Sequence, residues 1–84
     1  MSAVTDVVEA LARALTDRPD QVQVRESQHK GTTLVELFVA PGDLGKVIGK
    51  QGRTAAALRT LASTAGEREG KTVTLEIRDT PFKG

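Results

Sequence analysis

The sequence has no cysteine, tryptophan or tyrosine, and Phe38 and Phe82 are its two phenylalanines. The lack of cysteine excludes disulfide bonds and thiolate chemistry, which agrees with a reducing compartment. No stretch approaches the roughly 20 apolar residues that a membrane-spanning helix requires. The first residues have the pattern of an amphipathic helix rather than that of a signal peptide. We therefore expect a cytoplasmic protein without a membrane partner.

Residues suited to catalysis or metal binding are scarce as well. The single histidine, His29, lies in a polar segment that is expected to form a loop, with no second candidate ligand nearby. No spacing pairs two carboxylates in an apolar setting, as acid–base catalysis requires. A Walker loop needs four residues before its Gly-Lys-Ser/Thr end, whereas Gly45 and Gly49 enclose three. These absences predict a noncatalytic protein with no metal and no cofactor.

What remains is a small chain of balanced charge. With 84 residues and a net charge of +1, it has room for one domain with a modest core. No linker, repeat or low-complexity tract divides it. We expect a single domain over residues 1–84, with its core in residues 3–78 and a flexible C-terminal tail in residues 79–84.

The N-terminal part predicts an amphipathic helix from Ala3 to Thr16, with Ser2 as its N-cap. The segment 17–20, which contains a proline between two aspartates, ends the pattern. One face of this helix is expected to be buried. The apolar residues that follow helical spacing on that face are Val4, Val7, Val8, Leu11, Ala12 and Leu15.

Two further helices are predicted in the middle of the chain. The segment 41–43 stops the preceding strand and starts a short helix with Asp43 as its cap. The residues of this helix that are expected to face inward are Leu44, Val47 and Ile48. The next helix begins near Arg53 and closes at Gly66. The apolar residues that mark it are Ala55, Leu58, Leu61, Ala62 and Ala65.

Alternating apolar residues predict three strands. The first two, Gln21–Glu26 and Thr33–Ala40, are joined by a polar hairpin loop over residues 27–32 and should be antiparallel neighbours. The third covers Thr72–Arg78, with one face toward the core and one toward solvent. The residues expected on the buried face are Val35, Leu37, Val39, Val73, Leu75 and Ile77.

Leu34 and Phe38 fall on the opposite face of the second strand, and two interpretations are open. Either the C-terminal tail covers them, with Phe82 packed there, or they are exposed and form a surface for a protein partner. The second interpretation suits a small domain that works as a dimer, because pairing multiplies weak contacts through effective concentration.

In chain order the predicted elements follow the pattern α-β-β-α-α-β. The strands alternate in hydrophobicity, so one face of their sheet is apolar and needs a cover. Each helix has an apolar face that can supply this cover. The sequence therefore predicts a two-layer α+β domain with three helices on one face of a three-stranded sheet.

The segment from Val47 to Gly52 is the strongest local motif. Gly49 and Gly52 enclose Lys50 and Gln51 and open directly onto the third helix. Glycine lets a large ligand approach the backbone closely, and unpaired N–H groups at the positive end of a helix attract anions. The spacing predicts a phosphate site, and an ordinary turn between two helices is the alternative.

The charge pattern favours the phosphate site. No aspartate or glutamate occurs between Leu44 and Gly66, and the basic residues of that stretch are Lys46, Lys50, Arg53 and Arg59. Such a patch attracts a polyanion on a protein that is otherwise nearly neutral. A solvated helix face is the alternative interpretation of these charges.

The element order, with Val47-Ile48-Gly49-Lys50-Gln51-Gly52 between the two middle helices, resembles a KH domain of the prokaryotic type II arrangement. The resemblance extends from Ala3 to Arg78. Small bacterial proteins that consist of one KH domain form the KhpA family. The chain is similar to them in size, in this GXXG motif and in the residues Ala40–Lys46 that precede it.

The resemblance implies that the protein binds single-stranded nucleic acid, usually RNA, in a narrow groove. Carried onto this sequence, the loop residues that would hold phosphates are Gly49, Lys50, Gln51 and Gly52. Leu44 and Ile48 would line the groove beneath the bases. From charge and position alone we add Arg53, with Lys46 and Arg59 as weaker candidates because helix phase can turn either away from the groove.

Two features predict weak binding with little sequence preference. Thr54 and Ala55 stand where related motifs often have a larger aliphatic residue behind the loop, which predicts a shallower groove. Aromatic stacking adds roughly 1–3 kcal/mol per base in many single-strand binders. Neither phenylalanine of this sequence lies in the motif.

The expected role is that of an RNA chaperone or post-transcriptional regulator that works as a dimer. The small size of the domain favours a second copy as its partner, and the resemblance adds a larger bacterial RNA-binding protein of the Jag type, which also carries a KH domain. The alternative is a protein-interaction or dimerisation module in which RNA contact is dispensable. The sequence does not distinguish RNA from single-stranded DNA.

Overall fold

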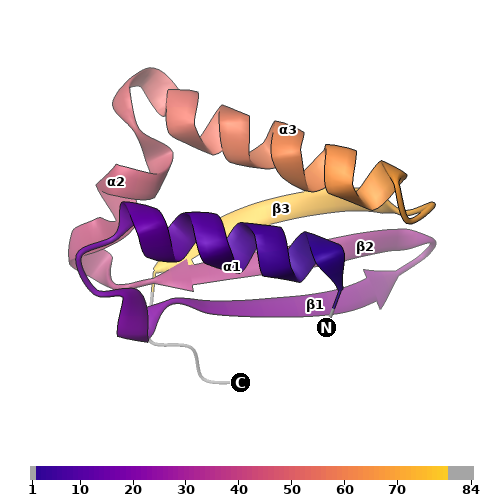
Figure 1. Ribbon diagram of the computed structural model, residues 1–84, viewed down its shortest axis with the longest axis horizontal. Coiled ribbons are helices and arrows are strands. Elements are labelled where there is room, and N and C mark those ends of the chain that lie inside the picture. Colours follow the sequence, from indigo (N-terminus) through magenta and orange to yellow (C-terminus); the bar gives the residue numbers. More distant parts are fainter. Residues whose placement is uncertain (1, 80–84) are drawn as a thin grey trace.

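The structure, a computed structural model, describes residues 2–79 (Figure 1). Within this range three α-helices lie on one face of a three-stranded sheet, which confirms the predicted two-layer fold and element order. With η for a single 3₁₀ turn, the elements are α1 (Ala3–Leu15), η1 (Pro19–Gln21), β1 (Gln23–His29), β2 (Thr32–Val39), η2 (Pro41–Asp43), α2 (Leu44–Ile48), η3 (Lys50–Gly52), α3 (Arg53–Glu67) and β3 (Thr72–Asp79). None of these helices combines the length and apolar composition that crossing a membrane takes.

The sheet has the strand order β1-β2-β3. β1 and β2 are antiparallel, as predicted, with Glu26 opposite Val35. β2 and β3 are parallel, with Val35 opposite Leu75. A parallel pair needs a crossover connection, and the segment from α2 to α3 provides it. The turn between these two helices therefore lies at one end of the helical layer, where Figure 1 shows it projecting from the molecule.

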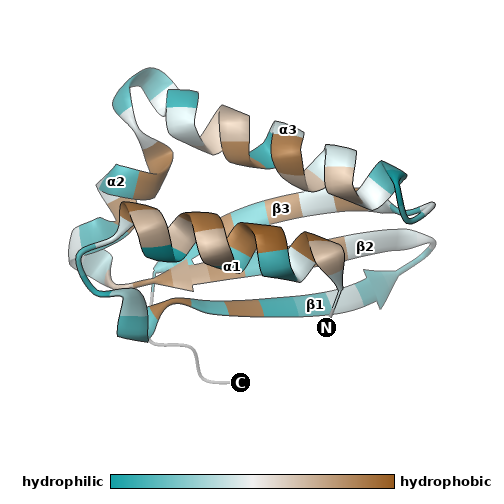
Figure 2. Ribbon diagram, in the orientation of Figure 1, coloured by the Kyte–Doolittle hydropathy of each residue, from teal (hydrophilic) through white to brown (hydrophobic). Residues whose placement is uncertain are grey.

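The core lies between the helices and the sheet. Val35, Leu37 and Val39 of β2 have no exposed surface, as their alternation predicts. The helical residues that pack on them are Val4, Val8, Ala12, Val47, Leu58 and Ala62. Figure 2 shows apolar residues along α1 and α3 and hydrophilic residues at the turn between α2 and α3. Burial of each Val or Leu side chain contributes roughly 1.5–3 kcal/mol, so this core fixes the direction in which α3 points.

The hairpin differs from its prediction. β1 begins two residues later than expected, after η1, and extends to His29, through half of the segment predicted to be a loop. The turn itself is Lys30-Gly31, whose φ angles of 51° and 81° suit a two-residue hairpin turn. The end of β1 lies at a sheet edge and is exposed, so it lacks the apolar alternation that identifies a half-buried strand.

The predicted start of α1 is confirmed, and the predicted end of α3 is wrong. Ser2 caps α1 as predicted, because its Oγ accepts the N–H of Thr5 at 3.2 Å. Gly66 does not close α3, which continues to Glu67, and it is buried against Val73 instead. Leu15, at the end of the predicted apolar face of α1, is 39% exposed.

Leu34 and Phe38, on the outer face of the sheet, are less exposed than a surface for a protein partner requires. Phe38 has 8% of its surface exposed and Leu34 is half-buried, so of the two interpretations the one with an exposed Phe38 is wrong, and coverage by the tail stays a prediction. Phe82 lies outside the described residues, as do residues 80–84 of the predicted tail. Asp79, assigned to that tail, is the last residue of β3.

Candidate nucleic-acid interface

The loop Gly49–Gly52 has an unusual backbone. Gly49 has φ 77° and ψ 171°, a combination open essentially to glycine alone. Gln51, with φ 57° and ψ 24°, lies in the left-handed region, where a side chain costs about 1–2 kcal/mol. Gly52 follows with φ 73°. Strain of this kind concentrates at functional sites, which favours a binding loop over an ordinary turn.

Thr54 packs against Gly49 at the base of the loop. A Cβ on Gly49 would lie 2.2 Å from Thr54 Oγ1 and 2.9 Å from the Thr54 backbone nitrogen. No other atom lies within 4 Å of the corresponding position on Gly52. Ala55, the other small residue behind the loop, is 2% exposed. These contacts explain why glycine is needed at position 49, while the depth of the groove stays a prediction.

Two backbone N–H groups of the loop are available to a ligand. Gly49 N–H donates to Gly45 O at 2.8 Å, and Gly52 N–H donates to Gly49 O at 3.1 Å. Within residues 2–79 the N–H groups of Lys50 and Gln51 donate no such bond. The 15-residue helix α3 starts beside them without a side-chain cap. Free donors at the positive end of a helix form a site for a phosphate.

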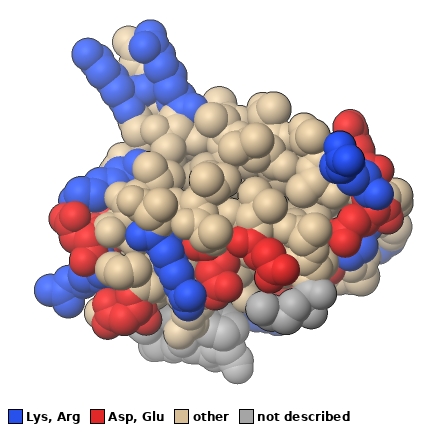
Figure 3. Space-filling model, viewed as in Figure 1, with Lys and Arg blue, Asp and Glu red and all other residues tan. Residues whose placement is uncertain are grey.

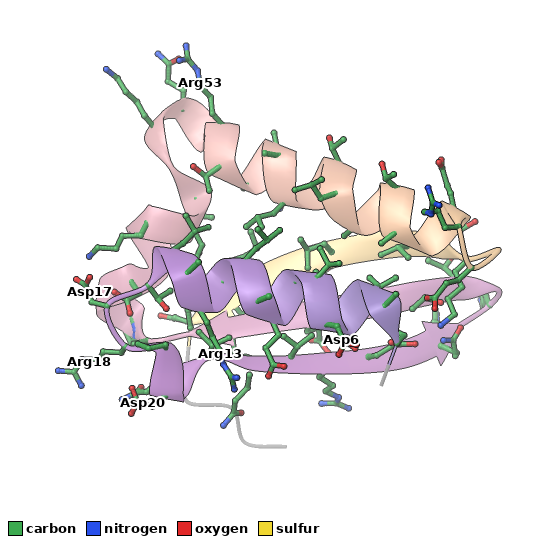
Figure 4. The ribbon with its side chains drawn as sticks, in the orientation of Figure 1. Asp6, Arg13, Asp17, Arg18, Asp20 and Arg53 are labelled. Carbon is green, nitrogen blue, oxygen red and sulfur yellow. The ribbon has the colours of Figure 1, made fainter. Side chains whose placement is uncertain are left out.

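Three long polar side chains surround this backbone. Lys50, Gln51 and Arg53 are exposed, and a terminal nitrogen of Arg53 donates to Gln51 Oε1 at 3.1 Å. Figure 4 shows Arg53 projecting beyond the helical layer. In Figure 3 the basic side chains at this corner have no acidic side chain beside them in view. Their positive charge therefore faces solvent and can attract a polyanion.

Lys46 is placed differently from Lys50. Its ammonium lies 2.9 Å from Asp17 Oδ2 and 3.6 Å from Asp43 Oδ1, and the hydrogen bond and charge of Asp17, followed by those of Asp43, raise the pKa of Lys46. Figure 4 shows Asp17 at the end of α1, well apart from Arg53. The charge of Lys46 is thus largely offset, which suits it less to RNA contact than the charge of Lys50.

For Asp43 the sequence predicts only the cap of the second helix, and the structure shows a different role. It stands at the N-cap position of α2 but makes no side-chain bond to that helix. Its carboxylate accepts the N–H of Asp17 at 3.2 Å and the N–H of Arg18 at 3.0 Å, with 4% of the side chain exposed. Burial favours the neutral acid, but these two donors and Lys46 outweigh it and lower the pKa of Asp43.

The predicted residues that remain are Arg59 of α3 and Leu44 and Ile48 of α2. Arg59 is exposed, and its Nε donates to Leu75 O of the edge strand β3 at 3.4 Å, so one hydrogen bond joins its side chain to this strand. Leu44 and Ile48 of α2 are half-buried. The structure therefore groups the loop Gly49–Gly52 with Arg53 at the projecting corner, and it directs Lys46 toward α1.

Comparison with known families identifies the type of domain. The family described as KhpA/KhpB, KH domain matches residues 5–77. The chain belongs to this family. "RNA-binding protein KhpA" of Aquifex aeolicus is 52% identical over 77 residues, which cover 92% of this chain and 98% of that protein. The KhpA protein of Halalkalibacterium halodurans is 48% identical over 73 residues, which cover 87% of this chain and 96% of that protein. These matches confirm the predicted KhpA family.

Solved structures of Era contain a similar fold. Era in complex with MgGDPNP and nucleotides 1506–1542 of 16S ribosomal RNA aligns with a TM-score of 0.66 and 22% identity, over 93% of this chain and 30% of the Era chain. Aquifex aeolicus Era bound to GDP.AlF4- aligns with a TM-score of 0.63 and 21% identity. At this identity the likeness shows the fold alone. A KhpA/KhpB domain thus corresponds to under a third of the longer Era chain.

Proposed function

We propose that this member of the KhpA/KhpB family is a noncatalytic protein that binds single-stranded RNA. The observation that carries the proposal is the loop Gly49–Gly52, where the free N–H groups of Lys50 and Gln51 meet the positive end of α3. Two relatives that align over most of this chain are named RNA-binding protein KhpA. These names support RNA rather than another polyanion as the ligand.

The proposed mechanism separates backbone capture from base contact. The loop N–H groups and Lys50 hold phosphates, with Gln51 and Arg53 beside them. Bases lie in the groove that continues toward Leu44 and Ile48, whose half-buried aliphatic side chains offer an apolar floor. Phosphate contacts provide affinity without sequence information, so this arrangement supports binding with little sequence preference.

The proposal extends to the cellular role. An RNA chaperone or post-transcriptional regulator in the cytoplasm needs a small module that holds single strands weakly. Such a module gains affinity as a homodimer, or as a heterodimer with a larger KH-containing protein of the Jag type, because two linked sites raise the effective concentration. Sedimentation velocity at tens of micromolar, with and without that partner, tests the assembly, and an unchanged monomer would remove it.

Fluorescence anisotropy with a degenerate short RNA at several salt concentrations tests the RNA site. The test variant combines Lys50→Asp with Gln51→Asp. Its matched control combines Lys30→Asp with His29→Asp in the hairpin, which Figure 1 shows at the opposite end of the molecule. Each pair changes the charge equally, and each places one aspartate at a position of positive φ, which aspartate tolerates.

We expect the parent and the hairpin variant to bind with a similar salt slope, near roughly 0.7 per phosphate contacted. The loop variant should lose most of its affinity and reduce the slope while remaining folded by circular dichroism. Equal binding by all three proteins would overturn the proposal, and equal weakening of both variants would assign the effect to net charge alone. A parallel titration with DNA of the same sequence distinguishes the two nucleic acids.

A further inference from the structure

Asp43 joins two parts of the helical layer that are distant in sequence. Its two carboxylate oxygens receive the N–H groups of Asp17 and Arg18, which follow the end of α1. Lys46, one turn further along α2, lies near both Asp17 and Asp43. We call this group of residues 17, 18, 43 and 46 the α1–α2 junction. It connects the end of α1 to the start of α2.

The junction matters because α2 cannot hold its own position. With only five residues, Leu44–Ile48, it is far shorter than the roughly 12–15 residues at which isolated helices become even marginally stable. Val47, which has no exposed surface, anchors its inner face. The loop begins directly after it, and the Gly49 N–H donates to Gly45 O of α2 at 2.8 Å. The direction of α2 therefore sets the place of the loop.

We propose that Asp43 is the positioning residue of the RNA-binding loop: by fixing the start of α2 against the end of α1, it holds the loop in its binding geometry without touching RNA. This inference rests on the proposed function. It concerns a residue whose negative charge gives it no direct use in binding a polyanion. Its buried carboxylate is instead committed to two backbone donors and one ammonium.

The positioning role and simple electrostatics predict opposite changes in RNA affinity when Asp43 is replaced, so the sign of the change in Kd tests the proposal. Asp43→Asn removes a negative charge from the helix that leads into the loop and raises the net charge from +1 to +2. More positive protein binds RNA more tightly if nothing else changes. The positioning role predicts weaker binding, because the asparagine amide presents one acceptor oxygen where two N–H groups must be received.

Glu26→Gln provides a matched control. Glu26 is also a carboxylate that joins elements, since it accepts the Ser2 hydroxyl at 2.7 Å and lies 3.5 Å from Lys71 Nζ. The substitution makes the same change in charge and shape. Glu26 is in β1 and contacts Ser2 at the N-terminal end of α1, whereas the α1–α2 junction lies at the C-terminal end of α1. Any effect of net charge on RNA binding should appear in both variants.

RNA anisotropy and amide hydrogen exchange of the folded variants test the inference. We expect a roughly threefold to tenfold higher Kd for Asp43→Asn, in the range of coupling through packed structure, with the salt slope of the parent. We also expect faster exchange at Gly49 and Gly52, whose N–H bonds close the loop, relative to Ala62 in the middle of α3. Glu26→Gln should bind RNA as tightly as the parent or more tightly and leave both glycines protected.

Asp43→Ser is the second variant, because serine still suits the N-cap of α2 but its single oxygen cannot receive both N–H groups. The same weaker binding is expected. Parental or tighter RNA binding by both folded Asp43 variants would overturn the inference, and so would global unfolding of both, which would give Asp43 a general role in stability. If the loop variant at Lys50 and Gln51 also binds as the parent does, the proposed function fails first.

Discussion

Gly49 and Thr54 are in contact across the base of the loop, so closely that any side chain on Gly49 would overlap Thr54 Oγ1 at 2.2 Å and Cβ at 2.7 Å. Gly49 also has backbone angles that essentially only glycine adopts. The same residue thus satisfies a conformational and a steric requirement. Gly52 satisfies only the first, since its Cβ position is open.

Gly49→Ala should therefore destabilise the protein more than Gly52→Ala. The left-handed conformation costs an alanine about 1–2 kcal/mol at Gly52, and the overlap with Thr54 adds to the cost at Gly49. Urea unfolding measures both free energies. Adding Thr54→Ala should not rescue Gly49→Ala, because the Thr54 backbone nitrogen would still lie 2.9 Å from the new Cβ. Equal losses in the two single variants would contradict this view of the loop.

Gly66→Ala should destabilise the protein although alanine is the better helix former. Helix propensity favours the substitution by about 1 kcal/mol, but the new Cβ would lie 2.4 Å from Val73 Cγ2 and 3.2 Å from Lys71 O. Overpacking of this kind costs about 1–3 kcal/mol. In a Val73→Ala background the clash with the side chain disappears, and Gly66→Ala should become neutral or stabilising. A double-mutant cycle by chemical unfolding reveals whether the sign reverses.

The sequence predicts the fold well because apolar periodicity and glycine spacing are local signals. Val35, Leu37 and Val39 alternate as a half-buried strand must, and they are fully buried. This apolar alternation is absent at the end of β1, where exposed residues up to His29 still form a strand. The sequence therefore predicts a hairpin loop of six residues, whereas two residues form the turn.

The candidate site is predicted only in part, for a physical reason. Gly49 and Gly52 identify the loop because its conformation needs them. Charge alone cannot separate Lys50, which faces solvent, from Lys46, which pairs with Asp17 and Asp43. Those partners depend on how α1 and α2 pack, and no local pattern reports that packing. For the same reason, the sequence predicts only a helix cap for Asp43.

Acid should weaken the fold through Asp43 and Glu26. The two N–H groups and Lys46 lower the folded pKa of Asp43 below 3.8 despite its burial, and the Ser2 hydroxyl, with Lys71, lowers that of Glu26 below 4.5. A lowered folded pKa gives stability above the unfolded pKa that is lost as pH falls through the folded value. The free energy of unfolding should therefore fall as the pH drops below 4.5.

Urea unfolding of Asp43→Asn and Glu26→Gln across this range checks the assignment. Each variant should be less stable than the parent at neutral pH and should approach the stability of the parent in acid, because each lacks one group whose protonation destabilises the parent. If the free energy of unfolding falls with acid as steeply in both variants as in the parent, other carboxylates cause the loss of stability.

On the alkaline side, the raised pKa of Lys46 gives stability below 10.5 that is lost as pH rises through its folded value.

Arg59 should affect which RNA is bound, whereas Lys50 should affect how tightly any RNA is bound. Arg59 Nε donates to Leu75 O at 3.4 Å, and we expect the terminal guanidinium nitrogens of this exposed side chain to contact a base. Base contacts carry sequence information and phosphate contacts do not. Because little sequence preference is expected, Arg59→Ala should reduce the small differences in binding free energy among short RNAs of different base composition by about 1 kcal/mol at most, the low end for a base contact. Lys50→Ala, as the control, should weaken all of them alike and lower the salt slope by about one phosphate. If Arg59→Ala instead weakens every RNA equally, its side chain contributes charge to the loop and not recognition of bases.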